Sequence, residues 1–314
     1  MLLLLQYTCI FASVLMLVAL GGCFAERSGV INIGLEGIMV IGALGGALVL
    51  KFLPVTVGPL VMVVATVLAS ALLGMLYSLL LAVAAISFKA DQTITGTAMN
   101  MLATAGATVA VKAMNTAASG GNDVSSDIAY THTKDLLLVR LGNFEFNWFM
   151  LVAVICLIAS YVILYKTKFG LRLRACGEHP QAADSVGINV YKMRYAGVLI
   201  SGILGGLGGI VYITAGVSVW KFEYGVAGFG FLAMAVMIFG GWHPLKIALA
   251  SLLFGFCRAL GNVYSGFSFL MALNIPSVVY NMLPYIISLV VLAFTSKHSQ
   301  GPKASGVPYD KGTR

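Results

Sequence analysis

The segment 166–195 is a long polar stretch between two apolar runs, and its residue types suit recognition of a protein partner. Pro180 suits the first turn of a short helix, and Gly187 suits the position just past its end. Between them, three small apolar residues share one face of that helix: Ala182, Ala183 and Val186. A compact apolar ridge of this kind could dock into a groove of a cytoplasmic partner. The alternative is an ordinary basic loop on the cytoplasmic side of a membrane.

The residue types needed for bond-making chemistry do not form a recognisable set. The four histidines are scattered among the predicted loops: His132, His179, His243 and His298. No Ser/His/Asp arrangement and no HExxH pattern occurs, and the five cysteines form no CxxC pair. No GxxxxGK[ST] phosphate-binding loop is present either. We therefore expect no catalytic site, no metal site and no cofactor bound by this chain.

A few polar side chains fall inside or beside apolar runs, where they are candidates for a solute pathway. Asn32 and Glu36 lie near the start of one run, and Asn100 lies inside another. Ionisable and polar groups within a membrane commonly face a bundle interior or a cavity. Two alternatives stay open: Glu36 could cap the first turn of its helix, and Asn100 could join neighbouring helices. Trp242 and two other tryptophans lie at span ends and are interpreted as anchors at the membrane interface.

The elements that must position these residues are membrane-spanning helices. The chain has 314 residues, of which 60% are hydrophobic and 10% charged, with a mean hydropathy of +0.96. So little charge cannot cover the surface of a water-soluble domain. We predict an all-α, polytopic transmembrane helical bundle of eight to ten spans. The candidate spans are 2–23, 33–53, 57–84, 93–117, 147–165, 195–217, 226–241, 246–264 and 276–295. Of these, 226–241 is short for a full crossing, and the alternative is a broken or re-entrant piece that continues after Pro244 into the next helix.

The distribution of charge predicts the orientation and argues against nucleic acid as a partner. Ten of the 19 Lys and Arg residues lie in 166–195 and 296–314, which are therefore expected on the cytoplasmic side. The loop 119–147 is acidic in balance and should face outside. Counting spans places Glu26, Arg27 and Lys89 inside and Lys51 outside. We expect one transmembrane domain over 1–295 and a disordered cytoplasmic tail over 296–314.

Three segments resemble a known family. The run from Gly170 to Ile188, GLRLRACGEHPQAADSVGI, is similar to the cytoplasmic coupling loop of ABC importer permeases of the branched-chain amino acid, ribose and nucleoside group. The run from Glu26 to Met39, ERSGVINIGLEGIM, resembles the nucleoside or simple-sugar permeases that work with basic-membrane-protein type lipoproteins. The segment 228–244, with GFGFLAMA and GGWHP, also fits that group. The resemblance covers about 24 to 295, and Cys176 and His179 depart from its usual pattern.

The resemblance implies a type II ABC importer-like permease fold in a prokaryotic cytoplasmic membrane. It implies a second permease subunit (the same or a different chain), two cytoplasmic ATPase subunits that bind ATP and magnesium, and an external substrate-binding lipoprotein. The residues it assigns to ATPase coupling are Arg172, Arg174, Gly177, Glu178, Pro180, Ala182, Ala183 and Gly187. The expected cargo is a nucleoside or related sugar or base. Branched-chain amino acid or simple-sugar transport, and a secondary transporter driven by an ion gradient, are the alternatives.

Overall fold

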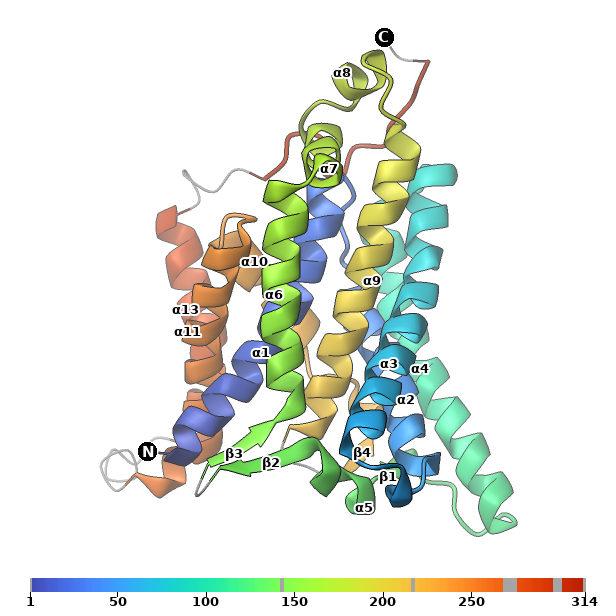
Figure 1. The fold of residues 1–314 in the computed structure, drawn as a ribbon, viewed down its shortest axis with the longest axis vertical. Helices are drawn as coiled ribbons and strands as arrows, with labels where there is room; N and C mark the ends of the chain where they lie inside the picture. Colours follow the sequence, from blue (N-terminus) through green and yellow to red (C-terminus); the bar gives the residue numbers. More distant parts are fainter. Residues whose placement is uncertain (1, 142–143, 216–217, 268–275, 296–300, 313–314) are drawn as a thin grey trace.

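The computed structural model describes residues 2–141, 144–215, 218–267, 276–295 and 301–312, and most of them are helical (Figure 1). The long helices are α1 (Leu2–Arg27), α2 (Leu35–Phe52), α3 (Pro59–Ala82), α4 (Gln92–Ser119), α6 (Trp148–Lys166), α9 (Val190–Thr214), α11 (Pro244–Val263) and α13 (Ser277–Thr295). Between them are α5 (Thr131–Lys134), α7 (Lys168–Glu178), α8 (Pro180–Ser185), α10 (Phe229–Phe239), the π-helix η2 (Val83–Ser87) and the 3₁₀ turns η1 (Val55–Val57), η3 (Asp135–Leu137), η4 (Phe222–Tyr224) and η5 (Tyr264–Gly266).

Seven helices within the described residues are long and apolar enough to cross a bilayer, fewer than the eight to ten spans expected. One difference is α10, whose 11 residues correspond to about 16 Å at 1.5 Å per residue, against a hydrocarbon core of about 30 Å. The expected span 226–241 is therefore a partial crossing, which ends at Gly240 before α11 begins at Pro244. The other is α13, a 19-residue helix whose side chains the structure describes only in part.

Helices α1 and α9 form the packed centre of the bundle. Both helices are largely buried, and α9 contacts α1, α2 and α3. Glycines permit this approach: a Cβ on Gly42 would overlap the backbone of Gly206, and one on Gly209 would overlap the Met39 carbonyl. Small residues at such crossings bring helix backbones close, which is how helices associate in lipid without a hydrophobic driving force. The glycine-rich runs therefore specify packing.

The two ends of the bundle differ in structure. At the end where the N-terminus lies, two small antiparallel sheets interrupt the otherwise all-helical fold (Figure 1). Strand β1 (Asp127–Ala129) pairs with β4 (Val219–Lys221), and β2 (Leu138–Leu141) pairs with β3 (Phe144–Asn147). Helices α7 and α8 and the C-terminus lie at the opposite end (Figure 1). The expected all-α architecture thus carries short strands, three of them in the acidic loop and β4 between α9 and α10.

Contacts between charged residues agree with the predicted grouping, in which Arg27 and Lys89 lie at the same end of the bundle as the basic loop and Lys51 lies at the other end. Arg27 lies 3.6 Å from Glu178, and Lys89 lies 3.0 Å from Asp310 of the tail. These residues therefore share the end that carries α7 and α8. At the other end, Lys51 donates to Asn115 at 3.0 Å.

The C-terminal tail differs from expectation over residues 301–312. Its composition predicted disorder, yet this segment lies against the bundle with Ala304 and Tyr309 buried. The physical reason is that Tyr309 finds an apolar site beside Cys176, Ala183 and Val190. Residues 296–300 and 313–314 lie outside the described residues.

Candidate functional site

Helices α7 and α8 form the candidate coupling site at the end of α6. Thr167 caps α7, its hydroxyl accepting from the amide of Gly170 at 3.2 Å. A Cβ on Gly170 would overlap carbonyls of the last turns of α6, so glycine permits the sharp α6–α7 corner. Pro180 opens α8, and Gly187 follows its end with φ +83°. The helix predicted between Pro180 and Gly187 is confirmed.

The three apolar residues between Pro180 and Gly187 do not share one exposed face as predicted. Ala183 is buried, packing inward with Cys176 and Val190. Ala182 is exposed, and Val186 is 75% exposed. The three residues separate because one side of α8 packs onto α7 and α9 and buries Ala183. Ala182 and Val186, four positions apart, remain together on the outward side.

The two arginines of α7 have different surroundings. Arg172 is exposed, whereas the guanidinium of Arg174 lies 4.6 Å from the ring centre of Tyr165 on α6. A guanidinium over an aromatic face is attracted by the ring quadrupole. Arg174 therefore orients α7 on α6, and Arg172 is the one of this pair available to a partner.

Glu178, at the end of α7, connects the coupling site to the bundle. Its Oε1 lies 3.6 Å from Nη1 of Arg27, the last residue of α1. The neighbouring Gly177 lies so close that a Cβ on it would overlap the Arg27 carbonyl. Arg27 also donates from Nε and Nη2 to the carbonyl of Trp242, at 3.4 and 3.2 Å. One guanidinium thus joins α7, α1 and the turn before α11.

Trp242 is an internal residue, which corrects its interpretation as an interface anchor. It is 6% exposed, and its indole Nε1 donates to Oε2 of Glu26 at 2.6 Å. Its backbone has φ +54°, a conformation that the surrounding contacts must hold. Glu26, Arg27 and Trp242 are not among the site residues expected from the sequence, although all three lie within the motifs quoted for the family resemblance.

The candidate pathway residues bond to other parts of the bundle. Glu36 on α2 accepts from the amides of Gly228 and Gly230, at 2.7 and 2.6 Å, and so caps α10. Gly230 permits this approach, because a Cβ there would lie 2.6 Å from the Cα of Glu36. The carboxylate is favoured at this position because helix N-termini carry free amides and partial positive charge. Glu36 caps a helix other than its own.

The two asparagines connect the α1–α2 loop to other helices. Asn100 on α4 accepts from the Gly37 amide at 2.8 Å and donates to the Ile33 carbonyl at 3.0 Å. Asn32 donates to the hydroxyl of Ser201 on α9 at 2.9 Å, while its Oδ1 is buried and has no hydrogen-bond partner among the residues that the structure describes. The structure therefore places all three pathway candidates around α2, with Asn100 serving as a helix connector.

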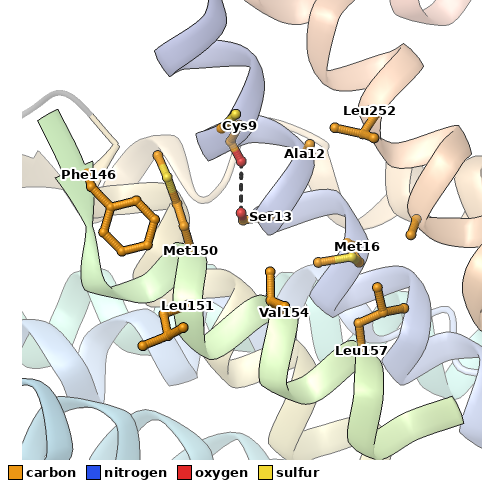
Figure 2. Close-up of a pocket in the computed structure, with 11 residues that line it drawn as sticks. Cys9, Ala12, Ser13, Met16, Phe146, Met150, Leu151, Val154, Leu157 and Leu252 are labelled. Atoms are coloured by element: carbon orange, nitrogen blue, oxygen red, sulfur yellow. Dashed lines mark hydrogen bonds between the residues drawn. The ribbon is translucent and has the colours of Figure 1, made fainter. Parts of the chain in front are cut away.

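An apolar pocket of about 470 Å³ lies between α1, α6 and α11 (Figure 2). Its hydroxyl group belongs to Ser13, which donates to the Cys9 carbonyl at 2.8 Å and is therefore already satisfied. Met16, Met150 and Leu252 are among the side chains that point into it (Figure 2). Such a lining offers little to a polar solute and gives no reason to place the pathway there. Among the residues that the structure describes, no cluster of three His, Cys, Asp or Glu side chains suits a metal ion.

Comparison with known proteins places this geometry in a family. The family model described as branched-chain amino acid transport system / permease component matches residues 4–294. The guanosine ABC transporter permease protein NupQ of Bacillus subtilis is 42% identical over 98% of this chain and 96% of its own. The nucleoside ABC transporter permease protein NupC of Lactococcus lactis is 38% identical over 96% of this chain and 95% of its own. A putative glucose ABC transporter permease of Haloferax volcanii is 31% identical over 79% of this chain and 74% of its own.

No solved structure shows a significant match to this chain. The family model and the two near-full-length relatives confirm the resemblance expected from the coupling loop and from the segment Glu26 to Met39. The chain is a transport subunit, and it belongs to the family of permease components of ABC transport systems typified by branched-chain amino acid transport.

Proposed function

We propose that this chain is the membrane-spanning permease subunit of an ABC importer that carries nucleosides into a prokaryotic cell. Two relatives that share more than a third of their residues with it over nearly the whole length are named as guanosine and nucleoside permeases. The segment from Glu26 to Met39 resembles the same branch, and in the structure it supplies Arg27, Asn32 and Glu36 to the contacts described above. ATP with magnesium is bound and hydrolysed by two partner subunits on the cytoplasmic side.

The observation that supports this function best is the link between Glu178 and Arg27. A force applied to α8 reaches α7 directly, because the two helices pack together around buried Ala183 and Cys176. From α7 it passes through the Glu178–Arg27 ion pair and the close contact of Gly177 to the end of α1. From Arg27 it continues to Trp242 and α11. Closure of the ATPase dimer would thereby bias the bundle between inward-facing and outward-facing states.

We assign the coupling residues to two groups by their exposure and their contacts. The exposed side chains of Arg172, Ala182 and Val186 form the surface that binds the ATPase. The others shape the loop: Arg174, Gly177, Glu178, Pro180 and Ala183 through their contacts, and the exposed Gly187 through its left-handed backbone. The exposed surface is small and partly apolar, as suits insertion of α8 into a groove.

For the solute pathway we propose the region around the start of α2. Asn32 supplies a buried acceptor, Oδ1, to which no group in the described part of the chain donates. Glu36 and Asn100 hold α10 and α4 in place around it through bonds to backbone groups. A nucleoside offers hydroxyl and amino donors to such an acceptor. A second permease subunit completes the pathway, and an external lipoprotein delivers the nucleoside to it.

The test is uptake of radiolabelled guanosine by proteoliposomes that contain the purified complex, with ATP enclosed on the ATPase side and the binding protein added on the other. We expect uptake that requires ATP and the binding protein, and that excess uridine reduces more than excess glucose or leucine. Uptake by this chain alone, driven by a sodium or proton gradient, would instead indicate a secondary transporter. Competition by leucine or glucose alone would redirect the substrate assignment.

A further inference from the structure

The tail over residues 301–312 contacts several separate helices at the coupling end of the bundle, rather than projecting from it. In Figure 1 the red tail runs past α7 to the C-terminus near α8. Its first residue, Gly301, lies beside the turn that precedes α11. A Cβ on Gly301 would lie 3.1 Å from Cζ2 of the Trp242 ring in that turn. The amide of Ala304 then donates to the Gly177 carbonyl at 2.9 Å. The first part of the tail therefore lies on α7 and on the Trp242 turn.

The middle of the tail interacts with a buried cation on α9. Arg194 is 1% exposed, and its Nη1 donates to the carbonyl of Val307 at 2.9 Å. Within the described residues, Nε and Nη2 of this guanidinium have no hydrogen-bond partner. A buried charge is costly unless polar groups compensate it. The Val307 carbonyl supplies part of that compensation, which fixes the tail to α9.

Tyr309 anchors the end of the tail in the coupling site itself. It is 4% exposed and packs with Cys176 of α7, Ala183 of α8 and Val190 of α9. Its ring meets that of Tyr191 edge-on, at a centroid distance of 5.3 Å. One aromatic side chain thus contacts all three helices that carry the coupling loop.

The next residue extends the connection to a further part of the bundle. Asp310 Oδ2 lies 3.0 Å from Nζ of Lys89, which is in the turn between α3 and α4. Both side chains are more than 40% exposed, so this ion pair contributes little free energy of attachment. Its role is to orient the end of the tail toward the turn between α3 and α4. Tyr309, by contrast, is a buried attachment of the tail.

We propose that residues 301–312 act as a strap that fixes the coupling helix α8 to α9 and to the α3–α4 turn, with Tyr309 as its positioning residue. The inference rests on the proposed function, since a strap of this kind matters only if α8 receives force from an ATPase. With Tyr309 in place, α7, α8 and the start of α9 share one apolar seat and move as one body. Without it, α8 rocks on α7 and ATP hydrolysis no longer drives the bundle fully.

The experiment measures guanosine uptake and ATP hydrolysis together in proteoliposomes of the complete importer. Tyr309→Ala is expected to lower uptake at least about tenfold while ATP hydrolysis stays within about twofold of wild type, so less solute moves per ATP. Tyr309→Phe keeps the ring and should restore the ratio. Val307→Ala is the matched control, because its side chain is 55% exposed and only its backbone carbonyl bonds to Arg194.

The proposal is overturned if Tyr309→Ala transports as much guanosine per ATP hydrolysed as the wild type. It is also overturned if Tyr309→Ala and Tyr309→Phe both lose uptake and ATP hydrolysis to the same extent. A second pair keeps the test decisive if Tyr309→Ala fails to assemble. Lys89→Glu should lower the ratio modestly, and the double variant Lys89→Glu with Asp310→Lys should restore it. A wild-type ratio in Lys89→Glu counts against the strap, as does a double variant whose ratio stays as low as that of Lys89→Glu. If wild-type vesicles show no ATP-dependent uptake, the proposed function fails, whatever the tail variants do.

Discussion

The carboxylate of Glu36, on α2, caps α10 by accepting from the amides of Gly228 and Gly230 at 2.7 and 2.6 Å. The residues are 192 and 194 positions apart in sequence, and the contact fixes a helix too short to cross the membrane. Helix α10 contacts α1, α2, α11 and α13, so its position affects much of the bundle. Glu36 is therefore a structural link as well as a candidate pathway residue.

Replacing Glu36 by Gln should destabilise the folded chain by about 1–3 kcal/mol, the usual effect of weakening hydrogen bonds to a charged acceptor. Glutamine keeps one carbonyl oxygen for the two amides and turns an NH₂ group toward the other. The measurement is the thermal unfolding midpoint of the purified protein in detergent. Glu223→Gln serves as the control, because Glu223 lies at the surface beside Lys112; equal midpoints for the two variants would contradict the capping role.

Glu178→Lys should lower ATP-driven uptake at least about tenfold with normal amounts of protein in the membrane. The new cation would face Arg27 and break the link between α7 and α1. Glu178→Gln, which removes the charge without adding repulsion, should cost less than about fivefold, since exposed ion pairs contribute about 1 kcal/mol or less. Uptake assays paired with membrane immunoblots check both. Normal transport by the lysine variant would exclude this ion pair from coupling.

Gly209→Ala should lower the unfolding midpoint strongly, because the added Cβ overlaps the Met39 carbonyl where α9 crosses α2. Overpacking of this kind typically costs about 1–3 kcal/mol. Gly106→Ala in α4 is the matched control: its Cβ meets nothing within 4 Å, and alanine favours a helix over glycine by about 1 kcal/mol. Unfolding monitored by size-exclusion chromatography after heating distinguishes them. A stable Gly209→Ala protein would show that these helices separate easily.

Labelling of introduced cysteines should place α8 and the acidic loop on opposite sides of the membrane. Gln181→Cys and Asn122→Cys put a thiol at exposed positions at the two ends of the chain's long axis. The native cysteines in this part of the molecule interfere little, since Cys176 is fully buried and burial raises the pKa of its thiol to about 11. An impermeant maleimide added to intact cells should label position 122 alone. Labelling at 181 would reverse the orientation and remove the ATPase from its proposed site.

The positions of the helices and the polar, partly helical nature of the loop 166–195 follow from local patterns in the sequence. Apolar runs of about 20 residues predict the spans because a helix of that length crosses the hydrocarbon core. The helical form follows because lipid offers no hydrogen-bond partners to backbone groups, so the segment has to satisfy them itself. Pro180 and Gly187 predict the bounds of α8 for equally local reasons. The ring of Pro180 fixes its φ at a value that suits the first turn of a helix. Gly187 adopts the left-handed φ that ends one. Such features depend on neighbours within a few positions, so they are visible without a fold.

Other features depend on which helices meet, and only the tertiary structure decides these. The bond from Trp242 to Glu26 joins residues 216 positions apart, and nothing near either residue indicates the other. Composition predicted a disordered tail, because it could not reveal an apolar seat for Tyr309 built from three separate helices. Hydropathy likewise predicted a span where α10 stops after 11 residues. The sequence by itself determined a multi-spanning permease with a polar loop over 166–195. Packing decided how that loop is attached to the bundle, because side-chain pairing across helices is set by the close approach of backbones rather than by distance along the chain.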